Sequence, residues 1–319
     1  MSSSRRSSRR RPRLRLAALA AVVLVALGGL AVASDAFGAG RLFDRALARI
    51  DRIIAGPVPE RPTVATVLVT PRPLTTPSAT RMTTAPPTST PLASGLGVAT
   101  AILEPSAEPT PERVPVDLDI AADPAGIFAS EVKDTWCSPA GVQITLAFLG
   151  KADTSVAFQR ELQGRVHEWE SYSDSHNGDW GPAAMALALD AYGAPGYEVR
   201  AYRTRQDALR DAATTIEATG SPVILLAWRG AHTWVMTGFR ADADPAIFPD
   251  ATVDGAYIVD PWYPRVSSIW GPSDPPGTFQ DGVEMVRNYL AWKRPEGHYA
   301  DRDGLFIAVV PTVKVLAGD

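Results

Sequence analysis

The pattern of hydrophobic and polar positions divides the chain into three parts. An apolar run, LAALAAVVLVALGGLAVA, occupies residues 16–33. Residues 57–115 contain many Pro, Thr, Ser and Ala residues and few large apolar side chains, so we expect a disordered stalk there. In residues 116–319 the apolar positions recur with the periods of helices and strands, which predicts a folded domain over that range.

Within this C-terminal part, helical patterns come first and strand patterns later. Apolar spacing predicts helices over residues 138–149, 180–192 and 206–219, and a glycine follows each of them. Thr204 and Asp207 form a capping-box-like start for the third helix. A last helix is expected near residues 283–292, and the expected strands are VPVDLDI, PVILLAW, HTWVMTGF, AYIVD and GLFIAVV. This order indicates an α+β domain rather than repeated βαβ units.

The N-terminal segment has the features of a membrane-inserted sequence. Residues 1–15 hold seven arginines and no acidic residue, and the 18 apolar residues that follow would rise about 27 Å as a helix, close to the thickness of the bilayer core. We therefore expect residues 1–15 to be a cytoplasmic tail, residues 16–34 a single-pass anchor in the cell membrane and residues 35–56 a juxtamembrane helix. The alternative is a cleaved signal peptide and a secreted protein, because Ala31-Val32-Ala33 resembles a cleavage site. In both cases the C-terminal domain is extracytoplasmic.

Charge separates this tail from the rest of the chain. Seven of the 31 basic residues are in the tail, which leaves 24 against 35 acidic residues and a net charge near −11. An acidic body repels phosphate backbones, and the sequence contains no phosphate-binding glycine loop or nucleic-acid motif. We therefore expect no nucleic-acid partner.

The chain has a single cysteine, Cys137, at the predicted start of the first helix. Exported proteins usually pair their cysteines or avoid them, so a single one is either a small buried hydrophobe or a reactive thiol. Backbone N–H groups and the positive end of the helix dipole favour a thiolate at this position. A thiolate nucleophile also needs an imidazole beside it and a third group that orients the imidazole.

His232 is the histidine best placed to serve this thiol. The other three histidines lie in polar loops: His167, His176 and His298. His232 instead opens the strand HTWVMTGF, and Asp260 ends the next strand, AYIVD. The start of one strand lies beside the end of its antiparallel neighbour, so we expect His232 and Asp260 to be adjacent.

Three blocks, in their order along the chain, resemble the papain-like cysteine peptidases of family thirty-nine, which include bacteriocin-leader peptidases. The blocks are DTWCSPAGVQITLAFLG, GSPVILLAWRGAHTWVMTGF and AYIVDPWYP, and the chain is most similar to stand-alone, exported members. The resemblance covers most of residues 116–319 and implies a papain-like fold, with N-terminal helices packed on an antiparallel sheet and no metal or cofactor. It also implies that Cys137 is the nucleophile, His232 the general base and then acid, and Asp260 the orienting group.

One position departs from this resemblance. The family usually has a glutamine six residues before the cysteine, whose amide helps to bind the oxyanion, and this chain has Glu131 there. An ionised carboxylate cannot donate a hydrogen bond and repels negative charge, so we expect a weak or silent site in which Glu131→Gln raises the rate. The sequence leaves four compensations open: Lys133, a shifted register, a protonated Glu131, or the backbone N–H of Cys137.

Other clusters give weaker signals of a site. Three aromatic residues near the cysteine and the aspartate could line a substrate groove or simply pack a loop: Trp136, Trp262 and Tyr263. Two further clusters lack the spacing of calcium or zinc motifs, so we expect no metal. They are Asp242, Asp244, Asp250 and Asp254, and His167, Glu168, Glu170, Asp174 and His176.

The sequence therefore predicts a membrane-tethered, extracytoplasmic thiol hydrolase that acts on peptide or amide bonds of a peptide or protein substrate. Two other functions are compatible with the same fold. One is a catalytically silent module that binds peptides or cell-envelope material, and the other is an acyl or peptidoglycan-remodelling transferase. The complete Cys–His–Asp set favours the enzyme, whereas Glu131 favours the silent module.

Overall fold

The computed structural model describes residues 64–70, 111–175 and 180–315, together with Val25, residues 27–30 and Ile50. Several predicted features lie outside these residues: the basic tail, most of the anchor, the juxtamembrane helix and the stalk, and His176. In the part of the chain that is described, no helix is long and apolar enough to cross a membrane.

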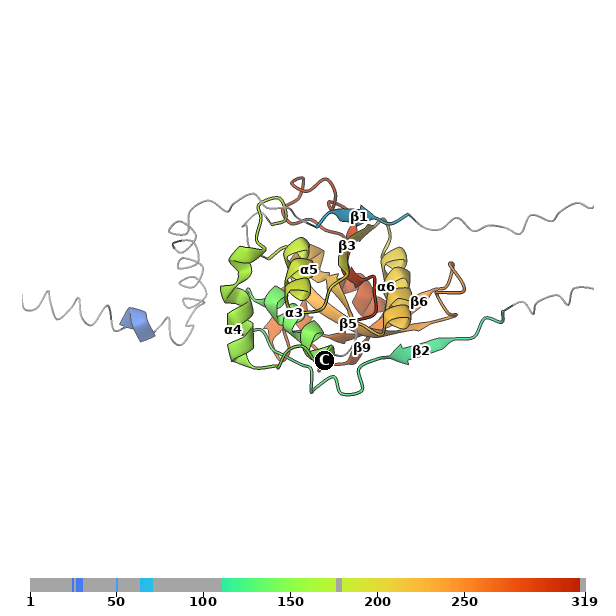
Figure 1. Ribbon diagram of the computed structural model, residues 1–319, viewed down its shortest axis with the longest axis horizontal. Helices are drawn as coiled ribbons and strands as arrows, with labels where there is room; N and C mark the ends of the chain where they lie inside the picture. Colours follow the sequence, from blue (N-terminus) through green and yellow to red (C-terminus); the bar gives the residue numbers. More distant parts are fainter. Residues whose placement is uncertain are drawn as a thin grey trace, which may run out of the picture.

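A central β-sheet organises the C-terminal domain. Its strands are β1 (Thr66–Leu68), β2 (Val116–Asp119), β3 (Tyr197–Tyr202), β4 (Val223–Leu226), β5 (His232–Ala241), β6 (Val253–Val259), β9 (Thr278–Asp281) and β10 (Phe306–Pro311). The strand order is β1-β3-β10-β4-β5-β6-β9, and β2 pairs with the C-terminal end of β5. A separate hairpin consists of β7 (Val266–Ser267) and β8 (Gly271–Pro272). Figure 1 shows this sheet at the centre of the domain.

The sheet is mixed, which corrects the antiparallel sheet that the resemblance implies. Strand β1 runs parallel to β3, whereas the other strand pairs of this sheet are antiparallel. The prediction of a disordered stalk is wrong for residues 64–70, because this segment contains β1 and pairs with the sheet. The segment VATVLVT is rich in β-branched residues, Val64 and Val69 pack on the core, and the Val69 N–H donates to the carbonyl oxygen of Ala201 over 2.9 Å.

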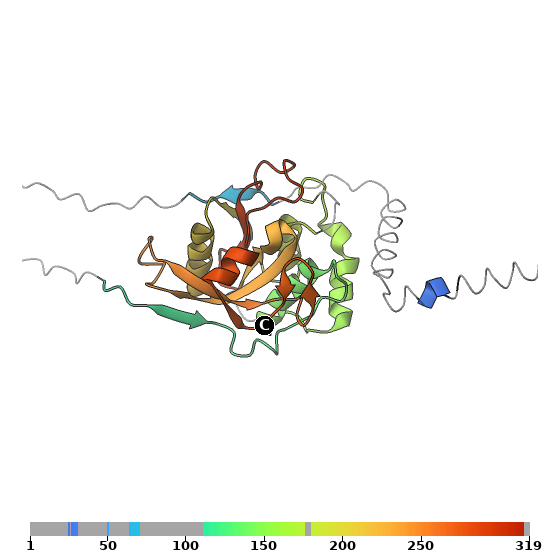
Figure 2. The same ribbon diagram turned by 180° about the vertical axis from the view of Figure 1, so that it is seen from behind.

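Helices cover both faces of the sheet. They are α3 (Cys137–Phe148), α4 (Val156–Gly164), α5 (Pro182–Ala191), α6 (Arg205–Thr219), α7 (Ala227–Gly230) and α8 (Gly282–Asn288), with a 3-10 turn at Val166–Glu168. Figures 1 and 2 show α3, α4 and α5 on one side of the sheet and α6 on the other. The α+β class predicted from the sequence is confirmed, with helices on both faces of the sheet.

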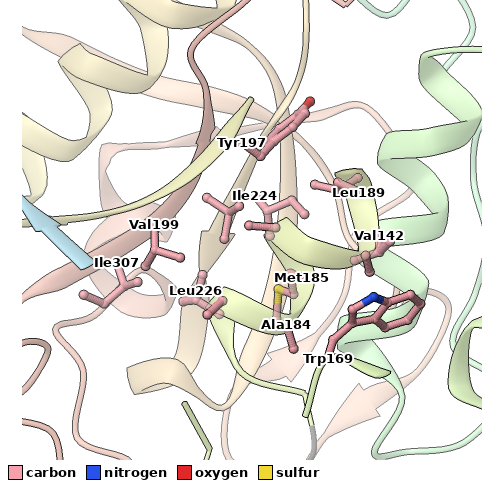
Figure 3. Close-up of a cluster of buried hydrophobic side chains, with 14 of the residues drawn as sticks. Val142, Trp169, Ala184, Met185, Leu189, Tyr197, Val199, Ile224, Leu226 and Ile307 are labelled. Carbon is pink, nitrogen blue, oxygen red and sulfur yellow. The ribbon is translucent and has the colours of Figure 1, made fainter. Parts of the chain in front are cut away.

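The alternation of side chains along β4 explains this arrangement. Ile224 and Leu226 point to the helices α3 and α5, whereas Val223 and Leu225 join the cluster beneath α6. Figure 3 shows the first of these clusters, which also includes Trp169. A strand buried on both faces reads as a continuous apolar run, and PVILLAW has that pattern.

The predicted cap of α6 is present. The Thr204 side chain accepts a hydrogen bond from the backbone N–H of Asp207, and Gly220 ends the helix with a φ of 63°. The other helices and strands predicted within residues 116–319 also form, with shifted ends, and the expected strand PVILLAW ends at Leu226, where α7 follows. The elements that were not predicted from the sequence, besides β1, are α4, the 3-10 turn at Val166–Glu168, β3, α7, β7, β8 and β9.

Candidate active site

Cys137 is the first residue of α3, where backbone N–H groups lack partners within the helix. The preceding residue, Trp136, makes no side-chain cap, and the first turn contains no acidic residue. Cys137 is half-buried, and its Sγ lies 3.9 Å from the carbonyl oxygen of Ala231. The positive end of the helix dipole therefore acts on this sulfur without a competing carboxylate in the first turn.

A glycine one turn further along the helix allows α3 to lie close to β5. A Cβ atom added at Gly141 would collide with the methyl group of Thr233. In the same contact, the hydroxyl oxygens of Ser138 and Thr233 are 3.5 Å apart. Thr233 directly follows His232, so this close approach brings the start of α3 beside the histidine.

His232 opens β5 after a strained turn. In that turn, Trp228 and Arg229 have φ values of 51° and 63°, a region that costs about 1–3 kcal/mol for each non-glycine residue. The Trp228 ring stacks on the His232 ring, with centroids 4.0 Å apart and an interplanar angle of 21°. The Trp228 indole N–H also donates to Asn288 over 3.0 Å, which fixes the ring. The turn therefore covers one face of the imidazole.

Asp260 binds the Nε2 side of the His232 ring. Its Oδ1 lies 2.7 Å from His232 Nε2 and accepts a second hydrogen bond, of 2.8 Å, from the backbone N–H of Trp262. The strands β5 and β6 are antiparallel here, with Val235 opposite Val259. Since Nε2 is engaged by the carboxylate, Nδ1 is the ring nitrogen left for the thiol.

The charges of these groups favour a thiolate–imidazolium pair. Burial alone would lower the pKa of His232, but Asp260 and Cys137 outweigh it and raise that pKa to about 10. Burial alone would raise the pKa of Cys137, but its hydrogen bond and attraction to His232, with help from Thr233 and Ser138, bring that pKa below its usual value. The pair can therefore carry a nucleophilic sulfur and a protonated imidazole together at neutral pH.

Glu131 lies beside this pair, in the place given by the sequence register. Its side chain is fully buried, and the pKa of its carboxyl group is raised to about 9, first by burial and then by the charge of Cys137. Arg265 donates to Oε1 over 3.2 Å and to the Glu131 backbone oxygen over 2.7 Å. Among the described residues, Oε2 has no hydrogen-bond partner. The carboxyl group is therefore neutral at pH 7, which corresponds to the protonated Glu131 among the four compensations that the sequence left open.

The three aromatic residues expected near the site differ in what they contact. Trp262 lies edge-on to His232 at 6.3 Å between centroids and contributes to the site's wall. Tyr263 instead packs edge-on against Phe128 at 5.9 Å, which fits the packing role. Trp136 is half-buried, and the Lys133 ammonium lies over its ring at 5.5 Å.

Sequence reasoning missed several residues that contact this site, among them Trp228 and Arg265. Trp228 was expected to end the strand PVILLAW but lies in the tight turn of α7, and Arg265 lies in the loop after β6. The run WRGAH immediately before His232 was the available signal for a tight turn carrying an aromatic ring. For Arg265 the sequence offers no signal beyond a cation five residues after Asp260.

The two clusters considered as metal sites are used in ion pairs. Arg113 contacts Asp242 at 3.2 Å and Asp250 at 2.9 Å. Asp174 is buried with Arg302, at 2.9 Å, and accepts hydrogen bonds from two backbone N–H groups at the start of α5. No group of three or more His, Cys, Asp or Glu side chains within the described ranges could hold a metal ion.

Comparison with known proteins agrees with this geometry. The model of the peptidase C39-like family matches residues 122–288, a span that includes Glu131, Cys137, His232 and Asp260. No curated protein matches the chain.

Among solved structures, the chain is similar to a double glycine motif protease from an AMS/PCAT transporter, crystallised in complex with its leader peptide. The identity is 18%, the alignment covers 58% of this chain and 91% of that one, and the TM-score is 0.30. A likeness of this size supports no statement about substrate. The family match alone covers just over half of the chain, and the chain therefore belongs to the peptidase C39-like family.

Proposed function

We propose that this C39-like domain is an active cysteine hydrolase that cleaves peptide or amide bonds. The observation that carries the proposal is the position of Cys137 at the open N-terminus of α3, beside a histidine that Asp260 holds at 2.7 Å. A buried structural cysteine has no need of an oriented imidazole. The raised pKa of His232 and the lowered pKa of Cys137 support the same assignment.

The proposed reaction proceeds through an acyl-enzyme. The Cys137 thiolate attacks the carbonyl carbon, a carbon–sulfur bond forms, and the carbonyl π electrons move to oxygen. His232 then gives its proton to the leaving nitrogen as the carbon–nitrogen bond breaks. In the second half, His232 takes a proton from water, whose oxygen attacks the thioester and releases the acid and the free thiol.

We also propose that the domain works outside the cytoplasm, tethered by the N-terminal segment. The support is the arginine-rich tail followed by the apolar run of residues 16–33. Labelling cysteines introduced into the tail and into an exposed loop of the domain, with a membrane-impermeant reagent on whole cells, would test the orientation. The proposal requires labelling of the domain and protection of the tail.

The hydrolase proposal is tested by incubating the protein with a broad peptide library and identifying the products by mass spectrometry. Cys137→Ala and His232→Ala should each abolish cleavage. His298→Ala, which changes an exposed loop histidine, is the matched control and should leave cleavage unchanged. Products joined to an added amine in place of water would identify a transferase. Cleavage unaffected by Cys137→Ala would show that Cys137 is not the nucleophile, and no cleavage of any peptide would support a silent binding module.

A further inference from the structure

We propose that Glu131 is a catalytic residue that acts as a neutral carboxylic acid, donating a hydrogen bond from Oε2–H to the oxyanion of the tetrahedral intermediate. This inference rests on the proposed hydrolase function. It assigns to Glu131 the donor role that an ionised carboxylate could not perform. The site is then complete, although it lacks the glutamine amide usual at this position.

The contacts of Glu131 determine which oxygen carries the proton. Arg265 approaches Oε1 at 3.2 Å, and a guanidinium group can only donate hydrogen bonds. Oε1 is therefore the accepting carbonyl oxygen, and the acid proton is on Oε2. In the described part of the chain Oε2 has no partner, although the Glu131 side chain is fully buried.

An unpartnered buried donor is costly unless a ligand satisfies it. Leaving such a group without a hydrogen bond costs the free energy of its lost hydration, which no protein contact replaces. A donor that gains its partner only when charge develops on the substrate oxygen contributes to the transition state and not to the ground state. The free Oε2 of Glu131 has the properties of such a preorganised donor.

The charged groups around Glu131 come from four parts of the fold. Cys137 faces it from the start of α3, His232 from β5, and Arg265 and Asp134 from the loops after β6 and before α3. Burial, the Cys137 thiolate and Asp134 favour the protonated acid, whereas His232 and Arg265 oppose it. The pKa of about 9 means that the protonating influences dominate.

The influences that keep Glu131 protonated persist during the reaction. When the thiolate sulfur bonds to the substrate carbon, its negative charge moves to the carbonyl oxygen, which is two bonds away. The anion that keeps Glu131 protonated is thus replaced by an anion that accepts its hydrogen bond. Carboxylic acids kept neutral by burial serve as oxyanion donors in other enzymes.

Arg265 has a positioning role in this arrangement. It binds the Glu131 backbone oxygen at 2.7 Å and the side-chain Oε1 at 3.2 Å, and it also contacts Asp134 at 3.1 Å. The Glu131 backbone N–H donates to the Pro261 carbonyl oxygen over 3.0 Å. These contacts join the loop before α3 to the loop after β6 and limit the rotation of the carboxyl group.

The experiment compares two reactions of Cys137 in the full-length chain. Acylation by p-nitrophenyl acetate forms an oxyanion, whereas alkylation by iodoacetamide reports on the thiolate without one. The ratio of the two rates therefore isolates oxyanion stabilisation from ionisation of the nucleophile. The variants are Glu131→Gln, which retains a donor, and Glu131→Met, which has similar length and no donor, with the exposed Glu296→Met as control.

At pH 7 we expect Glu131→Met to lower the acylation-to-alkylation ratio by about 10²–10³-fold, the usual effect of removing one oxyanion donor. Glu131→Gln should stay within about tenfold of the wild-type ratio, and Glu296→Met should equal it. Above pH 9 the wild-type ratio should fall as the acid ionises, whereas the Glu131→Gln ratio should stay level. If Glu131→Gln retains the acylation rate, the loss in Glu131→Met does not come from a folding defect common to substitutions at this position.

Three outcomes would overturn the inference. A wild-type ratio in Glu131→Met would show that the side chain does not contact the oxyanion. A rise of about 100-fold in Glu131→Gln at pH 7 would show that Glu131 is ionised in the wild type. If iodoacetamide alkylates Cys137 no faster than an ordinary thiol, the proposed hydrolase fails first, and this result is visible in the alkylation reaction alone.

Discussion

Replacing Asp260 with asparagine removes one charge beside His232 and leaves the shape of the site intact. The Asp260 Oδ1 accepts hydrogen bonds from His232 Nε2, at 2.7 Å, and from the Trp262 N–H, at 2.8 Å. The carbonyl oxygen of asparagine can accept both. The substitution therefore tests the electrostatic role of the carboxylate and changes the orientation of the imidazole little.

The size of the effect follows from the strength of this contact. A hydrogen bond to a charged group contributes about 1.5–3 kcal/mol, and one pKa unit corresponds to about 1.36 kcal/mol. Asp260 is the largest influence that raises the pKa of His232, so Asp260→Asn should lower that pKa by about 1–2 units. The thiolate–imidazolium form loses the same free energy, so its equilibrium constant relative to the neutral thiol–imidazole form should fall by about 10–100-fold.

The assay is the rate of Cys137 alkylation by iodoacetamide, followed by mass spectrometry over a series of pH values. In Asp260→Asn the rise in rate should move to higher pH. Asp254→Asn makes the same chemical change at an exposed position of β6 and should leave the profile unchanged. A profile for Asp260→Asn that superimposes on that of the wild type would refute the argument that this carboxylate tunes the pair.

Two further predictions concern the stability of the fold. Arg302→Met should lower the free energy of unfolding by about 3–5 kcal/mol in chemical denaturation, because it leaves the buried Asp174 carboxylate unpaired. Arg287→Met removes an exposed i,i+3 pair with Glu284 and should cost under about 1 kcal/mol; equal losses would contradict the argument. A fragment of residues 116–319 should be less stable than one of residues 60–319 by about 1–3 kcal/mol, because it lacks β1 and the Arg113 ion pairs. Identical melting curves would mean that β1 adds nothing to the domain.

Local signals in the sequence were sufficient to predict most of the helices and strands. The α3 helix begins within one residue of the expected start, with Pro139 in its first turn, and Gly150 follows its end. The apolar run of β4 and the capping box at Thr204 gave equally direct signals. The proximity of His232 and Asp260 was also predictable, since neighbouring antiparallel strands bring a strand start beside a strand end.

The parts that could not be predicted depend on tertiary contacts. Residues 64–70 lie within a stretch that has the overall composition of a stalk, and although their β-branched residues favour a strand, pairing with β3 is what orders the segment. Trp228 covers His232 because of a left-handed turn that its sequence alone does not specify. The protonation of Glu131 depends on complete burial and on the charge of Cys137, neither of which is a property of the local sequence.

The central claim is that Cys137 is a thiolate stabilised by His232. Cys137 is the only cysteine in the chain, so the ultraviolet absorbance of thiolate, titrated against pH, reports on this residue alone. The account predicts a midpoint well below the value of about 8.5 for an ordinary thiol, and a return to that value or above it in His232→Ala. A wild-type midpoint at or above about 8.5, unchanged by His232→Ala, would contradict it.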